Sequence, residues 1–254
     1  MSAGPPAIPP QRRRARLHVG AFRYSAVELL LALVLLFVSA PLVEDLPHGD
    51  LIEVVLLTLV MVSAVLAVGG SRRSLVVALV LVSPALVGKW IHHLRPDLIS
   101  PLVHIIAAMV FFLFVIAHLL LFILRAGRVD VNVLCAGLSG YLLLGLLWIP
   151  AYLLIASVDP GSFALKAPSG TDAQMDGFHA FYFSFITLCT VGYGDVTPVS
   201  RMARMLAVTE AITGIFYVAV LISRLVAVYS TTQRHDGGGP QVPDRKPTDP
   251  DPKL

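Results

Sequence analysis

Six consecutive residues combine oxygen ligands with an unusual backbone. Residues 190–195 read Thr-Val-Gly-Tyr-Gly-Asp, in which Gly192 and Gly194 alternate with larger residues. Glycine adopts left-handed backbone conformations that are costly for residues with a Cβ atom. A backbone that alternates in this way can point successive carbonyl oxygens to one side, where they replace the water around an ion. We therefore take this stretch as the candidate site for ion chemistry.

The segment before this stretch is apolar but too short to cross a bilayer. Residues 178–189 cover 12 positions, whereas a membrane-spanning helix needs about 20 apolar residues. We predict that they form a half-helix that enters the membrane without crossing it. Irregular backbone at that depth is tolerated only where it is buried in protein or lines a water-filled path. Residues 190–195 are therefore predicted to line such a path.

The composition requires an apolar environment for most of the chain. Of 254 residues, 56% are hydrophobic and 14% are charged, whereas about 25% are charged in an ordinary soluble domain. This excess indicates a lipid bilayer as the surrounding partner and excludes a typical soluble enzyme. A net charge of +3 is too small to indicate a nucleic acid partner. The predicted fold class is an all-α membrane protein without enzymatic activity.

Six apolar runs are long enough to form spanning helices. The first four are interpreted as accessory helices within residues 25–124, and the last two flank the half-helix within residues 131–229. The runs cover Ser25–Val43, Leu51–Val68, Ser74–Ile91, Ile99–Leu124, Val131–Val158 and Met205–Tyr229. Residues 1–24, a basic tail rich in Pro and Arg, and residues 230–254, rich in Gly and Pro, are predicted to be disordered.

Basic residues in the short loops predict the orientation of the chain. Five arginines lie in the N-terminal tail, and two more follow each of the second and fourth runs, whereas the loop after the first run has none. Lys89 and Arg95, which flank the loop after the third run, are the exception to this pattern. Six spans with both termini in the cytoplasm satisfy the distribution best, as expected for a multi-pass protein of the cell membrane.

Residues 187–195 resemble the potassium channel pore family. Its selectivity filter reads Thr-x-x-Thr-x-Gly-Tyr-Gly-Asp, and the chain matches this pattern from Thr187 to Asp195. The resemblance implies a pore module over 131–229, of prokaryotic type. Its parts are an outer helix (131–158), a pore helix (178–189), a filter (190–195) and an inner helix (205–229).

The resemblance also implies how the filter acts. A ring of four filters is needed and the chain holds one, so a homotetramer around a central pore is implied. K⁺ is the permeant ion, and no other cofactor is implied. The ion-binding filter comprises Thr190, Val191, Gly192, Tyr193 and Gly194, with K⁺ held at the first four.

Four residues, namely Asp195, Tyr182, Thr187 and Glu210, are candidates for supporting the filter. In the family, an acid like Asp195 is held by an aromatic donor of the pore helix, and Tyr182 occupies that position where a Trp is often found. Glu210, a carboxylate within the sixth run, is expected to bond a pore-helix hydroxyl. Gly214 lies where the family has a hinge glycine, although close helix packing would explain it equally well. The helical spacing of Ile215, Val218 and Ile222 predicts one stripe that could line an inner cavity.

The fourth run departs from the voltage-gated pattern. Voltage-gated channels place arginines at every third position of this span, but Ile99–Leu124 contains no Lys or Arg. We therefore expect a potassium-selective channel that is not steeply voltage-gated. A non-selective cation channel of the same fold is the alternative, and a subunit of a K⁺ transporter is a weaker one because known transporters of this kind repeat a degenerate filter four times.

Overall fold

The computed structural model describes residues 12–43, 49–95, 101–165 and 174–236, and these residues are largely helical. They form six long helices, one short helix and a two-stranded sheet. The helices are α1 (Arg12–Val43), α2 (Gly49–Val68), α3 (Arg72–Leu94), α4 (Pro101–Arg125), α5 (Val131–Val158), α6 (Gly177–Leu188) and α7 (Arg201–Asp236). The strands are β1 (Phe163–Leu165) and β2 (Val196–Pro198), and a 3₁₀ turn, Pro160–Ser162, precedes β1.

Acidic side chains fix where two of the central helices begin. The Asp130 carboxylate accepts the Val133 amide at the start of α5 at 3.0 Å, and the Asp176 carboxylate accepts the His179 amide at the start of α6 at 2.8 Å. An N-cap of this kind is worth about 1 kcal/mol because it satisfies a helix donor that has no partner within the helix. The short helix α6 therefore starts at a defined residue.

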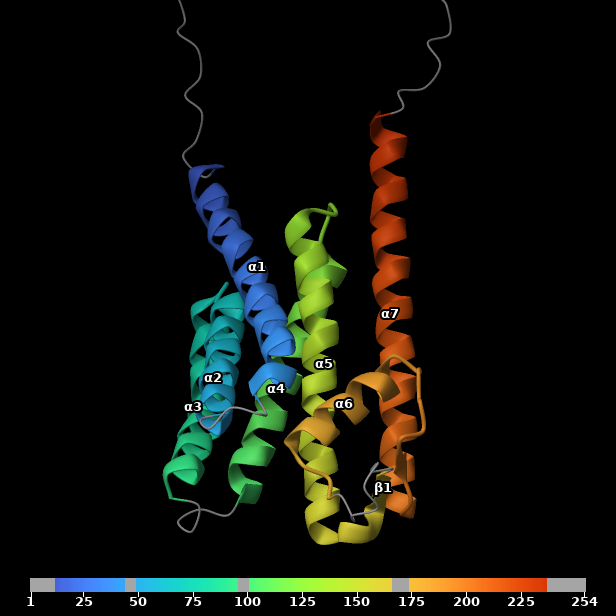
Figure 1. Cartoon of the computed structure of the whole chain (residues 1–254). Coiled ribbons are helices and arrows are strands. Elements are labelled where there is room, and N and C mark those ends of the chain that lie inside the picture. Colours follow the sequence, from blue (N-terminus) through green and yellow to red (C-terminus); the bar gives the residue numbers. More distant parts are fainter. Residues whose placement is uncertain (1–11, 44–48, 96–100, 166–173, 237–254) are drawn as a thin grey trace, which may run out of the picture.

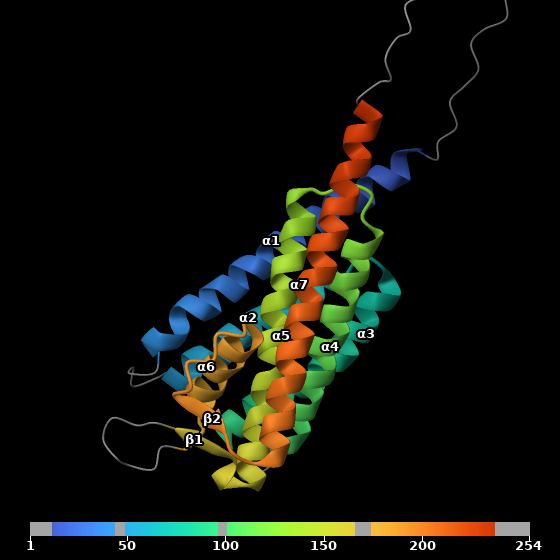
Figure 2. The same ribbon diagram turned by 90° about the vertical axis from the view of Figure 1, so that its right-hand side faces the viewer.

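The helices form a bundle in which neighbours in sequence are also neighbours in space. The pairs α1–α2, α2–α3, α3–α4 and α4–α5 pack side by side, and α6 packs on both α5 and α7 (Figure 1). A large apolar core joins α1 to α5 and reaches Leu188 of α6 and Tyr217 of α7. The beginning of α1 and the end of α7 lie at one end of the molecule, away from β1 and β2 (Figure 2). The short helix is thus held between α5 and α7.

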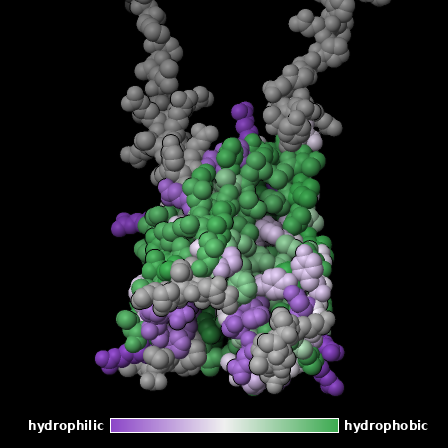
Figure 3. Space-filling view, in the orientation of Figure 1, coloured by the Kyte–Doolittle hydropathy of each residue, from purple (hydrophilic) through white to green (hydrophobic). Residues whose placement is uncertain are grey.

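Five of the described helices are long and apolar enough to cross a membrane, namely α2, α3, α4, α5 and α7. In α1 the apolar part is shorter, covering Ala26–Leu42, so the first predicted span, Ser25–Val43, stays a prediction. Most of the surface in Figure 3 is hydrophobic, and hydrophilic residues gather at the lower end. An apolar surface of this extent indicates contact with lipid or with other subunits rather than with water.

Two helices extend beyond their predicted ends. The helix α1 begins at Arg12 and α7 ends at Asp236, so residues 12–24 and 230–236 are helical although they were predicted to lie in disordered tails. In residues 12–24, Arg, Ala and Leu propagate the helix once the adjoining apolar segment has nucleated it. The remaining tail residues, 1–11 and 237–254, lie outside the described residues.

The strands β1 and β2 are an element that the all-α prediction lacked. They pair antiparallel, with Ala164 opposite Thr197. The segment after α5 is thereby tied to the segment before α7. Since α6 and the loop that follows it lie between these two strands in sequence, the pairing closes the chain around them.

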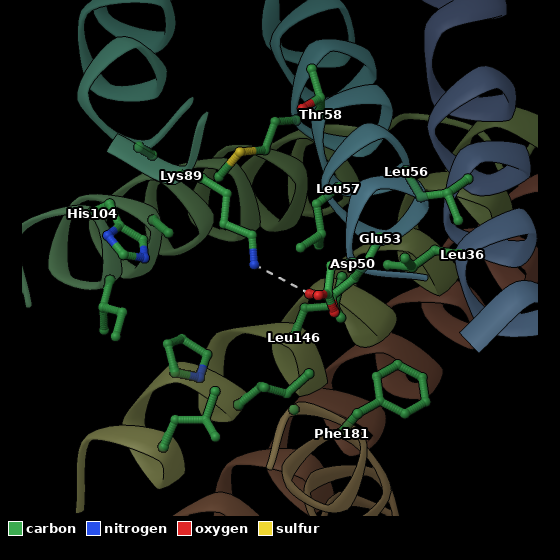
Figure 4. A pocket seen from close by; sticks show the side chains of 18 of the residues that line it. Leu36, Asp50, Glu53, Leu56, Leu57, Thr58, Lys89, His104, Leu146 and Phe181 are labelled. Carbon is green, nitrogen blue, oxygen red and sulfur yellow. Dashed lines mark hydrogen bonds and ion pairs between the residues drawn. The ribbon is translucent and has the colours of Figure 1, made fainter. Parts of the chain in front are cut away.

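A cavity of about 750 Å³ lies between the accessory helices and the start of α6. Lys89 of α3 and Glu53 of α2 form an ion pair of 3.2 Å across it, and Phe181 of α6 lies on its wall (Figure 4). Isolated pairs with exposed side chains contribute about 1 kcal/mol or less. The packing of α6 therefore depends mainly on its apolar contacts and on the polar contacts described next.

Candidate functional site

The candidate site is the loop between α6 and β2. The chain enters at the end of the molecule that carries the strands, reaches the middle along α6, and returns beside α7 to the same end (Figures 1 and 2). The 12 residues of α6, Gly177–Leu188, begin and end one position before the predicted half-helix. This path places residues 189–195 between the middle of the bundle and its strand-bearing end.

The backbone of this loop alternates in handedness. Thr190, Gly192 and Gly194 have φ angles of 57°, 54° and 76°, and these are the positive φ values among the described residues. A β-branched residue such as Thr190 rarely adopts this conformation, which costs on the order of 1–3 kcal/mol. Such strain persists only where the surroundings determine it, and it is concentrated at functional sites.

Hydrogen bonds from the last turn of α6 hold the loop in this conformation. The Ile186 carbonyl oxygen accepts the amides of Val191 at 2.8 Å and Gly192 at 3.2 Å. The Thr187 carbonyl oxygen accepts the Thr190 amide at 2.9 Å. Three successive loop amides therefore donate toward α6, which leaves their carbonyl oxygens available to a ligand on the other side.

The two glycines of the loop are needed for their backbone angles and not for space. A Cβ atom added at Gly192 or Gly194 would meet nothing within 4 Å, so neither position is crowded in a single chain. The positive φ is the constraint, because it is unfavourable for residues with a Cβ atom. Substitution at these positions would therefore change the loop conformation without any steric clash.

One face of the loop is uncovered. The side chains of Val191 and Tyr193 are 52% and 73% exposed, although both are large and apolar. Along α7, Ile215, Val218 and Ile222 are exposed as well. These positions follow helical spacing and share a stripe, as predicted. In a single chain the side chains of Val191 and Tyr193 and this stripe therefore stay exposed.

An aromatic donor braces the end of the loop. The Tyr182 hydroxyl donates to Asp195 Oδ2 at 2.6 Å, which is the pairing that the family pattern implied. Asp195 Oδ1 also accepts the Val196 amide at 3.0 Å. A tyrosine hydroxyl carries its proton at neutral pH, so Tyr182 is the donor and the Asp195 carboxylate is the acceptor.

Glu210 lies at the centre of a buried polar cluster. It is fully buried in α7, and its Oε1 lies 2.6 Å from the Ser184 hydroxyl of α6. This is a hydroxyl of the predicted pore helix, the kind of partner expected for Glu210. The Tyr152 hydroxyl of α5 donates to Oε2 of the same carboxyl group. The cluster links all three helices that surround the loop.

Gly214 allows α7 to approach the end of α6. A Cβ atom at this position would lie 2.6 Å from the Leu188 carbonyl oxygen and 2.9 Å from Leu188 Cδ1. A backbone atom at such a distance cannot yield without moving α6. These distances support close packing at Gly214, whereas its use as a hinge stays a prediction.

The sequence alone did not identify two members of the cluster, Ser184 and Tyr152. Each is a polar residue within an apolar helix, and a buried polar group needs a partner. The need for a partner was a usable signal, but it does not identify a partner that lies 26 or 58 positions away in the sequence. Tyr141, whose hydroxyl lies 3.3 Å from the Leu188 carbonyl oxygen, was missed for the same reason.

The bond between Tyr182 and Asp195 predicts a specific stability effect. Tyr182→Phe removes a hydrogen bond to a carboxylate that is partly exposed, so we expect the free energy of unfolding to fall by about 1–2 kcal/mol. Asp195→Ala removes the same bond, and the double variant should therefore lose much less than the sum of the two single losses. Chemical unfolding of the purified variants measures this coupling. Fully additive losses would show that the two side chains act independently.

Comparison with known proteins identifies the region around this loop. A family model described as an ion channel matches residues 141–231, which include most of α5, all of α6, the loop and nearly all of α7. The match therefore covers the structural unit in which the candidate site lies. Ion channels are not an enzyme family.

Curated relatives resemble this chain over short segments. Two pore potassium channel c of Oryza sativa subsp. japonica is 36% identical over 76 residues, 30% of this chain and 16% of that protein. Voltage-gated potassium channel Kch of Escherichia coli (strain K12) is 56% identical over 36 residues, 14% of this chain and 9% of that protein. Protein LctB of Bacillus caldotenax is 39% identical over 67 residues, 25% of this chain and 49% of that protein.

These matches span less than half the length of each of these relatives. No solved structure matches the chain significantly. Two of these relatives are named as potassium channels, which agrees with the family model's description as an ion channel. The chain is a multi-pass membrane protein whose residues 141–231 match an ion channel family model, and segments of it are similar to potassium channels.

Proposed function

We propose that this chain is one subunit of a potassium-selective channel that conducts K⁺ passively. The observation that carries the proposal is the backbone of residues 190–194, where positive φ angles alternate and the loop amides donate toward α6. Such a loop presents carbonyl oxygens on one side. A K⁺ ion that enters a narrow pore must exchange its hydration oxygens for ligands of this kind.

The ligands would come from Thr190, Val191, Gly192 and Tyr193, with the Thr190 hydroxyl completing the innermost ring. One chain supplies one ligand of each ring, so four copies around an axis are needed to surround the ion. The uncovered face of the loop and the exposed stripe on α7 support this arrangement, because both would be covered in a homotetramer. K⁺ is then the permeant ion rather than a bound cofactor.

The short helix has an electrostatic part in this proposal. The partial negative charge of a helix lies at its C-terminus, and α6 ends in the middle of the bundle, next to the loop. Four such ends would favour a cation at the inner side of the filter. Because α6 enters and the loop leaves at the same end of the molecule, we infer that α6 is a re-entrant pore helix in the membrane.

The proposed topology has six spans and cytoplasmic termini in the cell membrane. The long helices alternate in direction, and the beginning of α1 and the end of α7 lie at the same end of the molecule (Figures 1 and 2). Both observations support an even number of crossings. The first crossing would use the apolar part of α1, Ala26–Leu42, and the residues that precede it. Arginines in the N-terminal segment favour the cytoplasmic side.

The accessory helices lack the charges of a voltage sensor. Between Leu102 and Leu124, α4 contains no Lys or Arg, and Arg125 stands at its end. Gating charges must lie within the membrane field to move through it. We therefore propose that the pore is not opened steeply by voltage.

Ion selectivity tests the proposed function. Purified protein in liposomes should pass K⁺ much faster than Na⁺, and under bi-ionic conditions the reversal potential should follow the K⁺ gradient. Gly192→Ala should reduce the K⁺ flux at least about tenfold, because each of four subunits would bear about 1–2 kcal/mol of left-handed strain. Gly127→Ala is the matched control, since Gly127 lies in the α4–α5 loop with nothing within 4 Å of an added Cβ.

The outcomes of this measurement separate the alternatives. Equal flux of K⁺ and Na⁺ through the wild-type protein would indicate a non-selective cation channel and contradict the proposal. Flux that saturates and depends on a second ion would indicate a transporter subunit. Loss of flux in Gly127→Ala as well as in Gly192→Ala would show that the effect does not come from the filter.

Voltage dependence is tested separately in planar bilayers. Because α4 has no gating charge before Arg125, the open probability should vary only weakly between negative and positive potentials. Single-channel recording over that range measures it directly. A steep sigmoidal rise of open probability with voltage would contradict this part of the proposal.

A further inference from the structure

The polar cluster around Glu210 contains three close contacts between oxygen atoms. The Ser184 hydroxyl lies 2.6 Å from Glu210 Oε1 and 2.8 Å from the Gly145 carbonyl oxygen. The Tyr152 hydroxyl is bonded to Glu210 Oε2. Two oxygens approach this closely only when a proton lies between them, so the three contacts need three protons.

The side chains can be counted against this need. Tyr152 and Ser184 each carry one hydroxyl proton, and the Gly145 carbonyl oxygen carries none. If Glu210 were ionised, two protons would have to serve three contacts, and Ser184 would face two acceptors with a single donor. A proton on Glu210 supplies the third.

Only one assignment then gives every contact its proton. Ser184 must donate to Gly145, because a carbonyl oxygen cannot donate. Ser184 therefore accepts from Oε1 of Glu210, and Tyr152 donates to Oε2. We infer that Glu210 is a protonated, neutral positioning residue that donates to Ser184 and so joins α5, α6 and α7 through one directed chain of hydrogen bonds.

Burial supports a neutral carboxyl group. Glu210 has no exposed surface, and neither ion pair found in the described part of the chain includes it. An ionised carboxylate in a low-dielectric interior without a cation beside it is strongly disfavoured. A carboxylic acid in the same place needs only hydrogen bonds, which the cluster supplies.

The chain of hydrogen bonds acts on the site through α6. Ser184 lies two residues before Ile186, whose carbonyl oxygen holds the loop amides of Val191 and Gly192. Anchoring Ser184 to α5 and α7 therefore sets the position of the carbonyl that holds the loop. The neutral state of Glu210 is inferred from the geometry and burial of the cluster. The effect of Glu210 on ion flux, in contrast, rests on the proposed function.

Infrared spectroscopy of the purified wild-type protein tests the protonation directly. The chain contains four glutamates, Glu28, Glu44, Glu53 and Glu210, so ¹³C labelling of glutamate carboxyls marks few groups. We expect one labelled band of a protonated carboxyl at neutral pH, which disappears in Glu210→Gln and persists in Glu28→Gln, a control on the exposed surface of α1. A spectrum in which all labelled glutamates absorb as carboxylates would overturn the inference, even if the variants fail to fold.

Three variants test the positioning role. Glutamine has an oxygen and an NH₂ group where the neutral acid has two oxygens and a proton, so Glu210→Gln should keep the K⁺ flux within about twofold. Ser184→Ala and Glu210→Ala break the chain and leave buried groups unpaired, so the flux should fall at least about tenfold. Equal losses in Glu210→Gln and Glu210→Ala would contradict the role of the donated proton.

The two readouts also separate this inference from the proposed function. The wild-type protein and all variants could fail to pass K⁺ while the labelled carboxyl band is present in the wild type and lost in Glu210→Gln. This result would establish the proton on Glu210 and refute the channel function. Unfolding midpoints then test the positioning role without ion flux. Glu210→Gln should keep the wild-type midpoint, and Ser184→Ala should lower it.

Discussion

The Ile186 carbonyl oxygen is the atom on which the candidate site depends most. It accepts two loop amides, those of Val191 and Gly192, at the end of a helix that stops in the middle of the bundle. A carbonyl in a continuing helix would be occupied by the amide four residues later. Because α6 ends here, this acceptor is free to hold a backbone that would otherwise relax out of its left-handed conformation at Thr190.

The Ile186 carbonyl oxygen can hold the loop only if α6 itself is fixed in position. The surrounding helices fix α6 in two ways. Small residues let backbones approach: a side chain at Gly145 of α5 would collide with the Phe185 ring, and one at Gly214 of α7 would collide with Leu188. Directed polar contacts then select the position, since Ser184 lies within hydrogen-bonding distance of α5 and α7. Apolar packing alone permits sliding, whereas hydrogen bonds in a low-dielectric interior specify one register.

The sequence predicted those parts of the structure that depend on local pattern. The length of the apolar segment after Phe178 predicted a short helix, and the Val131–Val158 run matches α5 at both ends. The resemblance to the potassium channel pore family implied the pairing of Tyr182 with Asp195, which the structure contains. Contacts between distant segments could not be predicted from local pattern. Apolar periodicity does not indicate which hydroxyl contacts Glu210. No local feature of the sequence indicated that Phe163–Leu165 pairs with Val196–Pro198. The helix α1 starts earlier than predicted because the helix propensity of Arg, Ala and Leu in residues 12–24 favours continuing the helix despite the high charge of this segment.

The central claim is that residues 190–193 present rings of carbonyl oxygens to K⁺ in a fourfold assembly. Electron cryomicroscopy of the full chain in a lipid nanodisc containing K⁺ tests it most directly. The account predicts four copies around one axis, with residues 190–194 of each facing that axis and ion density between successive carbonyl rings. Copies in which this loop faces lipid, or an assembly without a shared axis at the loop, would contradict it.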